Sequence, residues 1–135
     1  MSISRLAPAL LFSSLVCSCG LTPDRPVIEG ASLFGRPLEQ IVPEGDRLES
    51  LTGDLSQART LWSAEPNEAN AIWVGRRLGY LGRYSEAIEW FTATLQEFPG
   101  SYRLLRHRGH RHISLRQFAR AETDLTRAWT LARDH

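Results

Sequence analysis

Arginine and histidine side chains gather in two short runs of the chain, and both residue types can bind ligands. The first run is Gly75-Arg76-Arg77, and the second extends from Arg106 to His112. A guanidinium group donates paired hydrogen bonds to a carboxylate or phosphate, whereas imidazole ligates metal ions or exchanges protons near neutral pH. The two runs are therefore compatible with anion binding, metal binding or acid–base catalysis.

Catalysis and metal binding both lack the further residues that they need. The sequence contains no GxSxG, no HExxH and no glycine-rich phosphate loop, and a His112–Asp124 pair has no nucleophile beside it. His107 and His110 are one helical turn apart, but His112 lies two residues from His110 and points elsewhere. Four metal ligands therefore do not converge. We predict a protein without catalytic residues, bound metal or cofactor.

Charge is divided unevenly along the chain. Residues 19–67 carry four arginines against eight acidic residues, whereas residues 68–135 carry eleven arginines against seven. This division separates an acidic arm from a basic body. The excess of four positive charges on the body is too small to predict nucleic-acid binding.

The N-terminal residues 1–18 are typical of an export signal. Arg5 precedes an apolar run from Leu6 to Val16, which is too short to span a bilayer and has the length of a signal-peptide core. A plain secretory signal and a buried N-terminal helix are two interpretations of this segment, and the residues that follow it favour a third.

The run Val16-Cys17-Ser18-Cys19-Gly20 resembles the lipobox of bacterial lipoproteins. An aliphatic residue stands three positions before Cys19 and a small residue immediately before it, while Cys17 departs from the pattern. The resemblance implies cleavage before Cys19, lipidation of that cysteine, and anchoring to a cell-envelope membrane, facing the periplasm or on the outer membrane. A Cys17–Cys19 disulfide would be strained, because a single residue separates the two cysteines.

Residues 19–45 are predicted to form a flexible tether between the membrane and the body. Proline and glycine break helices at this density, and no alternating run is long enough to predict a strand. The apolar pairs Leu33-Phe34 and Ile41-Val42 could dock on the body and order part of the segment. The helix-breaking residues are Pro23, Pro26, Gly30, Gly35, Pro37, Pro43 and Gly45.

From residue 46 onward the apolar residues recur at helical spacing. Residues 46–67 hold a leading helix or partial repeat that ends before Pro66, with Gly53-Asp54 as a break within it. Asn67 and Ser101 are expected to cap the helices that follow them. Four further helices are predicted, over Glu68–Tyr80, Tyr84–Phe98, Tyr102–Ser114 and Phe118–Arg133.

Two segments of the chain, residues 68–101 and 102–135, repeat each other with a period of 34 residues. This period, with small and aromatic residues at fixed places, is typical of stacked helix pairs. The two segments resemble the tetratricopeptide repeat (TPR) family. The matching residues are Gly75, Tyr84, Ala87, Phe91 and Pro99 in the first segment, and Gly109, Phe118, Ala121, Leu125 and Ala128 in the second. The departures are Ala71, Leu78 and Thr94 in the first segment, and Leu105 and His112 in the second.

The TPR resemblance implies an all-α fold of antiparallel helix-pair repeats, a TPR-like α-solenoid, with a concave binding groove. The groove positions of the family fall on Ala69, Ile72, Arg76, Gly79 and Tyr80, and on Arg103, Arg106, His110, Ile113 and Ser114. Of these, Arg76, Tyr80, Arg103, Arg106 and His110 are the predicted binding residues for a peptide or anion. The alternative is that these arginines are solvated or paired with acids of the same chain.

Arg108 and His112 stand where the first repeat has the apolar residues Val74 and Leu78. A charge at an interior helix position is costly unless it is paired. We predict an ion pair with Asp124 or Glu122 of the facing helix. The alternative is a twist of the helix that exposes this face.

The function that these patterns predict is a membrane-tethered, non-catalytic scaffold of the bacterial cell envelope that binds a protein or an acidic peptide. Two alternatives stay open. One is an anion- or metal-responsive protein that uses the Arg/His groove, and the other is a truncated remnant of a longer repeat array. Such arrays normally need at least three units, so the last helix, with Trp129 and Leu131, is also predicted to self-associate or to dock a partner.

Overall fold

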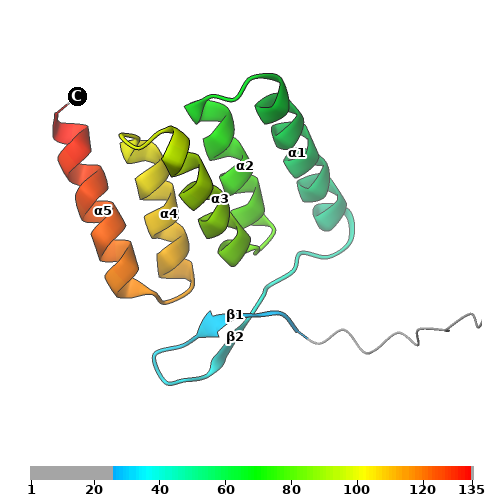
Figure 1. Cartoon of the computed structure of the whole chain (residues 1–135). Coiled ribbons are helices and arrows are strands. Elements are labelled where there is room, and N and C mark those ends of the chain that lie inside the picture. The colour runs from blue at the N-terminus through cyan, green and yellow to red at the C-terminus, as the bar shows by residue number, and fades with distance from the viewer. Residues whose placement is uncertain (1–25, 135) are drawn as a thin grey trace, which may run out of the picture.

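The computed structural model of the chain describes residues 26–134. The predicted signal segment 1–18 and the predicted lipidation site Cys19 lie outside the described residues. Within the described range the chain is predominantly helical, as the sequence predicted, with a small hairpin before the helices (Figure 1). The elements are β1 (Ile28–Ala31), β2 (Pro37–Glu39), α1 (Gly45–Ala64), α2 (Glu68–Tyr80), α3 (Tyr84–Glu97), α4 (Tyr102–Ser114) and α5 (Phe118–Arg133).

Local signals set the helix ends close to where the sequence placed them. The side chain of Asn67 accepts a hydrogen bond from the backbone N–H of Asn70 (2.9 Å), and Ser101 accepts one from Leu104 (3.0 Å), which confirms both predicted caps. Gly82, with a φ of 73°, follows α2 in the left-handed conformation that glycine adopts readily. The bounds of α2, α4 and α5 agree with the prediction, and α3 ends one residue earlier.

The predicted break at Gly53-Asp54 is absent, because α1 runs through both residues without interruption. Leu55 and Ala58 of this helix are buried against the body, which offsets the modest helix-weakening effect of one glycine. Asp54 forms an ion pair, with its Oδ2 atom 2.8 Å from Nη1 of Arg77 on α2.

Each helix packs against the next one along the chain, and α2 also contacts α4 (Figure 1). The core between them is formed by apolar side chains, of which the largest fully buried ones are Phe91, Leu78, Leu104, Leu105 and Val74. Glycine is needed where two helices approach closely. A Cβ atom at Gly75 would overlap the ring of Phe91, and one at Gly109 would lie 2.9 Å from Cγ of Leu125.

The predicted tether, residues 19–45, contains two short strands that the sequence did not predict. Here β1 and β2 pair antiparallel, with Gly30 opposite Leu38 and Ala31 opposite Pro37. The turn between them closes through Gly35, whose φ of 74° suits glycine, and Pro37 stands at the first position of an edge strand, where no N–H is required. Strands of four and three residues are too short to give an alternating pattern in the sequence.

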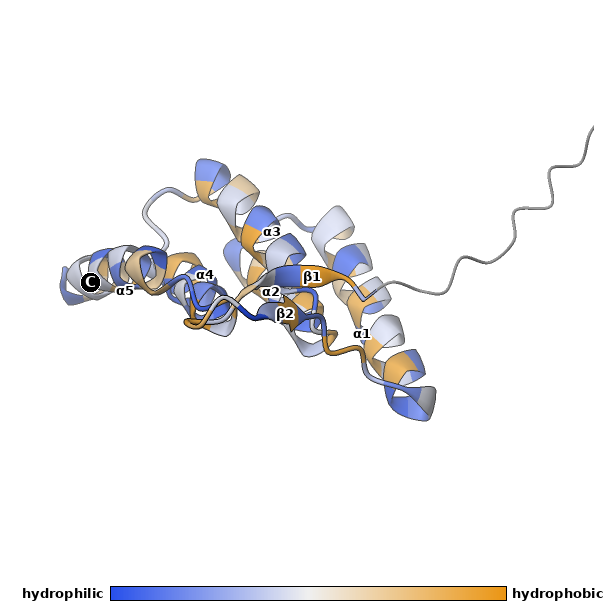
Figure 2. Ribbon diagram, turned by 90° about the horizontal axis from the view of Figure 1, so that it is seen from below, coloured by the Kyte–Doolittle hydropathy of each residue, from blue (hydrophilic) through white to orange (hydrophobic). Residues whose placement is uncertain are grey.

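The hairpin lies across the ends of the helices, as Figure 2 shows from below. Hydrogen bonds from its polar groups join it to the body. The carboxylate of Glu29 accepts hydrogen bonds from the backbone N–H (2.8 Å) and the hydroxyl (2.5 Å) of Ser85, and Gln40 donates weakly to the carbonyl of Leu81 (3.5 Å). The predicted docking of Leu33-Phe34 and Ile41-Val42 was wrong, because these four side chains are exposed.

Candidate functional site

A cavity of about 90 Å³ lies between α2, α3 and α4, and two arginines of the runs, Arg76 and Arg111, line it. Two glycines of α2, one helical turn apart, let two of its lining side chains approach that helix closely. Gly75 leaves room for the ring of Phe91, and a Cβ atom at Gly79 would overlap the guanidinium group of Arg111. The residues that line the cavity are Gly75, Arg76, Tyr80, Phe91, His107 and Arg111.

Arg76 and Tyr80 form one side of this cavity. They are four residues apart on α2 and therefore share a helix face. The Nη2 atom of Arg76 donates a hydrogen bond to the Tyr80 hydroxyl (2.7 Å), and its guanidinium carbon lies 4.3 Å from the ring centroid of Trp73. These contacts hold the guanidinium group in place without neutralising its charge.

Arg111 lines the cavity from α4. Its guanidinium carbon lies 5.4 Å from the ring centroid of Tyr84. Burial lowers the pKa of Arg111, while the neighbouring Tyr84 and Tyr80 act in the opposite direction. The group stays protonated because arginine begins from a very high pKa. Arg111 thus brings a half-buried positive charge to the cavity.

The charges of Arg76 and Arg111 are not balanced by an acid of this chain. Among residues 26–134, neither arginine has a carboxylate within ion-pair distance. Other arginines of the same body do have one, such as Arg77 with Asp54 and Arg59 with Glu86. Two fixed guanidinium groups beside one cavity are an arrangement that favours a bound anion.

His107 closes the cavity from α4 as a neutral side chain. Its ring stacks on Phe91, with centroids 6.0 Å apart and an interplanar angle of 16°. Burial, together with the nearby positive charges of Arg106 and Arg76, lowers the pKa of His107 from 6.5 to about 4. At neutral pH the positive charge of the cavity therefore comes from the two arginines.

The depressed pKa of His107 predicts a loss of stability in mild acid. As the pH falls from 6.5 towards 4, the unfolded chain binds a proton on this residue that the folded chain does not bind. For this partly exposed group, we expect a loss of about 1–2 kcal/mol in the free energy of unfolding. His107→Phe keeps an aromatic ring against Phe91 and should reduce the loss by that amount in urea titrations at pH 7 and pH 4.5. An equal loss in both proteins would contradict the assignment.

The structure brings together only part of the predicted groove set. Arg76 and Tyr80 line the cavity, whereas Arg106 and His110 are exposed and do not. Arg103 pairs with Glu68 instead (3.6 Å), and the hydrogen bond that it donates to the Tyr102 hydroxyl raises the pKa of Arg103.

Sequence reasoning missed His107 and Arg111, each one residue further along α4 than a predicted groove residue. One residue turns the side-chain direction by about 100° on a helix, which is enough to exchange a surface position for a cavity position. Gly79 was the available signal, because a second glycine one turn after Gly75 makes room for a large side chain from another helix.

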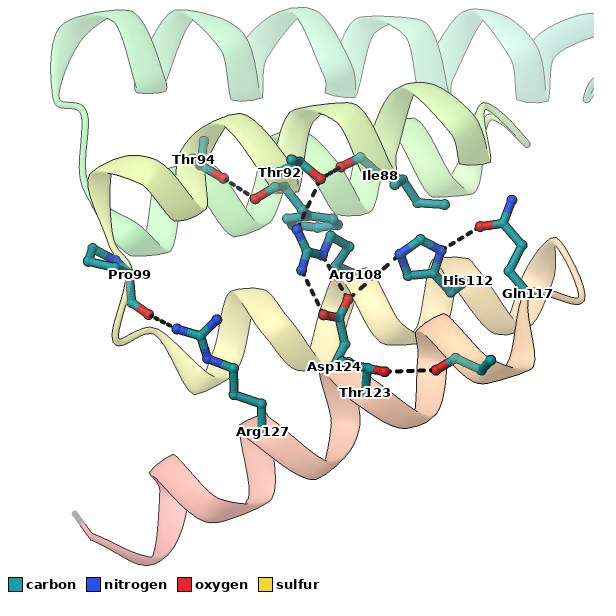
Figure 3. Close-up of polar contacts among 12 residues, drawn as sticks. Ile88, Thr92, Thr94, Pro99, Arg108, His112, Gln117, Thr123, Asp124 and Arg127 are labelled. Carbon is teal, nitrogen blue, oxygen red and sulfur yellow. Dashed lines mark hydrogen bonds and ion pairs between the residues drawn. The ribbon is translucent and has the colours of Figure 1, made fainter.

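Arg108 forms the predicted ion pair with Asp124 (Figure 3). Its Nε and Nη2 atoms donate to the two carboxylate oxygens of Asp124 (2.7 and 2.6 Å), and Nη1 donates to the Thr92 hydroxyl (3.1 Å). His112 lies beside this pair, with Nε2 at 3.7 Å from Asp124 and Nδ1 at 2.7 Å from the side-chain oxygen of Gln117. Every group in the cluster has a partner within the protein, so we assign the cluster a structural role.

The three histidines of α4 have separate surroundings. His107 stacks on Phe91, His110 faces solvent, and His112 joins the ion-pair cluster. In the part of the chain that the structure describes, no three His, Cys, Asp or Glu side chains come together as metal ligands.

The cavity with its two unpaired arginines is therefore the candidate site, and comparison with known proteins adds no further assignment. Among residues 26–134, no helix has both the length and the apolar character needed to cross a membrane. No protein-family model matches this chain, and no curated protein matches it.

Proposed function

We propose that this protein is a non-catalytic binding module of TPR-like helix pairs that recognises an acidic peptide through the cavity between α2 and α4. The 34-residue period and the caps at equivalent places support the repeat assignment. The equivalent close contacts of Gly75 with Phe91 and of Gly109 with Leu125 support it as well. Stacked helix pairs share one continuous core, and their exposed faces commonly bind peptides or proteins.

The observation that carries this proposal is the pair of guanidinium groups of Arg76 and Arg111, which line one cavity from two different helices and have no acidic partner among residues 26–134. A carboxylate bound in the cavity would be attracted by both guanidinium groups and could accept charge-assisted hydrogen bonds from them, with the Tyr80 hydroxyl close by. A volume of about 90 Å³ is far below the roughly 300–1,000 Å³ of pockets that enclose a whole small molecule. The cavity therefore suits one acidic group of a larger ligand, such as a side-chain or terminal carboxylate.

An inorganic anion is the second candidate ligand, because phosphate suits the same two guanidinium groups. The metal-responsive alternative has less support, since the three histidines of α4 do not face one another.

We further propose that the module is tethered to a bacterial cell-envelope membrane by a lipid on Cys19. The Val16-to-Gly20 run supports this proposal. We also propose that α5 self-associates or docks a partner. Trp129 of that helix is 62% exposed, and Leu131 is only partly covered.

Binding of short peptides that end in aspartate or glutamate tests the cavity. Calorimetric titration should show binding of the free-acid form, with about tenfold or greater weakening in Arg76→Ala or Arg111→Ala, since each variant removes one charge-assisted contact. Arg106→Ala is the matched control, because Arg106 is an exposed arginine of α4 that does not line the cavity.

The outcomes of this titration separate the candidate ligands. Equal affinity of the wild type for free-acid and C-terminal amide forms would remove the terminal carboxylate as the recognised group. Unchanged affinity in the Arg76→Ala/Arg111→Ala double variant would overturn the site itself. Binding of inorganic phosphate alone, with no peptide binding, would favour the second candidate.

A further inference from the structure

The segment before α1, residues 26–44, carries an unusual set of exposed apolar side chains; we call this segment the hairpin arm. Six of its large apolar residues are more than half exposed: Val27 (59%), Ile28 (52%), Leu33 (74%), Phe34 (92%), Ile41 (76%) and Val42 (52%). In the rest of the described chain, Trp129 alone exceeds one half. Exposed apolar side chains grouped on one segment are typical of a surface that contacts a protein or a membrane.

The hairpin arm is fixed to the helices through its polar groups, so its apolar side chains point outward for a structural reason. The Glu29 carboxylate is held by Ser85 at the start of α3. The backbone carbonyl of Ile41 lies so close to Gly82 that a Cβ atom there would overlap it. Figure 2 shows the arm in front of the helix ends, with hydrophobic residues in β1 and in the segment after β2.

The tip of the hairpin is its most exposed part. Leu33 and Phe34 lie between the two strands, in a turn closed by hydrogen bonds from Ser32 N–H to the carbonyl of Arg36 (2.7 Å) and from Gly35 N–H to that of Ser32 (3.0 Å). Arg36 is exposed beside them as the charged residue nearest the tip. The acidic residues of the arm, Glu29, Glu39 and Glu44, lie away from the tip, and Glu29 is held by Ser85.

The chain that precedes the arm limits what can cover it, if Cys19 carries a lipid as proposed above. Seven residue steps separate Cys19 from Pro26, the first described residue, and they reach at most about 25 Å. The arm therefore stays close to the bilayer. Its effective concentration at the membrane surface is high, so that even a small apolar contact with lipid can form.

We propose that the hairpin arm is a second membrane contact, in which Leu33 and Phe34 enter the interfacial region of the bilayer that holds the Cys19 lipid. Apolar side chains at this depth lie about 5–10 Å into the boundary between headgroups and acyl chains. Such a contact would place the α2–α3 and α4–α5 connections on the membrane side of the protein. The orientation of the candidate site relative to the membrane would then be fixed.

Lipid-borne quenchers test this contact in the mature lipoprotein purified from membranes and reconstituted into phosphatidylethanolamine/phosphatidylglycerol vesicles. A fluorophore is attached at Ala31→Cys, beside the tip, or at Ala64→Cys, an exposed residue at the other end of α1. A helix of 20 residues is about 30 Å long, which keeps the second position away from the arm. We expect nitroxide-labelled lipids to quench the probe at residue 31 and not the probe at residue 64.

The double variant Leu33→Asp/Phe34→Asp should lower quenching at residue 31 to the level of residue 64. Both side chains are exposed, so circular dichroism should show an unchanged fold. Equal quenching at the two positions, or quenching that survives the double variant, overturns the contact. Chemical crosslinking of the arm to a second copy, without quenching, overturns it in favour of self-association.

Mass spectrometry of the same preparation separates this inference from the proposal on which it rests. An acylated Cys19 together with an unquenched probe removes only the second contact. An unmodified Cys19 removes the anchor and the contact together, while peptide binding in the α2–α4 cavity is tested independently.

Discussion

Replacing Arg108 with alanine should destabilise the fold by about 3 kcal/mol, because a buried carboxylate loses its bidentate partner. Asp124 is 5% exposed, and Arg108 donates to both of its carboxylate oxygens. The remaining neighbour, His112 at 3.7 Å, is too distant for a normal hydrogen bond. Urea denaturation at pH 7 measures the change in the free energy of unfolding.

The matched control removes both charges at once. Arg108→Val/Asp124→Leu should be nearly as stable as the wild type, within about 1.5 kcal/mol, because an apolar pair leaves no unpaired charge in the interior. The first repeat supports this choice, since Val74 stands at the position of Arg108 and is fully buried. The single variants Arg108→Val and Asp124→Leu complete the comparison. If the double variant loses as much stability as these two lose together, the loss of the ion pair is not what destabilises the single variants.

Replacing Gly75 with alanine should also destabilise the protein, by about 1–3 kcal/mol, although alanine favours helices. The added Cβ would overlap the far end of the Phe91 ring, which is 1% exposed and stacked on His107. Moving the ring out of the way would therefore disturb its packing in the core and its stacking on His107. Thermal unfolding followed by circular dichroism should show a lower midpoint.

Gly53→Ala is the internal comparison for this result. Gly53 lies in the middle of α1, and a Cβ atom there meets nothing within 4 Å. We expect a gain of about 0.5–1 kcal/mol from helix propensity alone. The two substitutions are chemically identical, so effects of the same sign would show that the contact of α2 with Phe91 does not control stability.

The helices could be predicted from the sequence because their signals are local. Asn67 and Ser101 cap the helices that follow them, and Gly82 ends α2, through contacts within a few residues. The pairing of Arg108 with Asp124 was also predictable, since a charge at an interior helix position requires a partner on the facing helix.

The candidate site was only partly predictable. Arg76 and Tyr80 share a face of α2 whatever surrounds it, so their pairing follows from helical spacing. Which side chains of α4 meet them depends on how α4 is rotated against α2, and one residue of difference exchanges Arg106 for its cavity-lining neighbour His107.

The hairpin could not be predicted from the sequence and is seen only in the tertiary structure. Its strands are too short to be stable or recognisable alone, and Glu29 is fixed by Ser85, 56 residues further along the chain. The sequence by itself thus determined the helices, their caps and the need for a buried ion pair, because these depend on neighbours a few residues apart. The tertiary structure alone decided which arginines face the cavity and which apolar residues stay exposed, because both depend on contacts between distant segments.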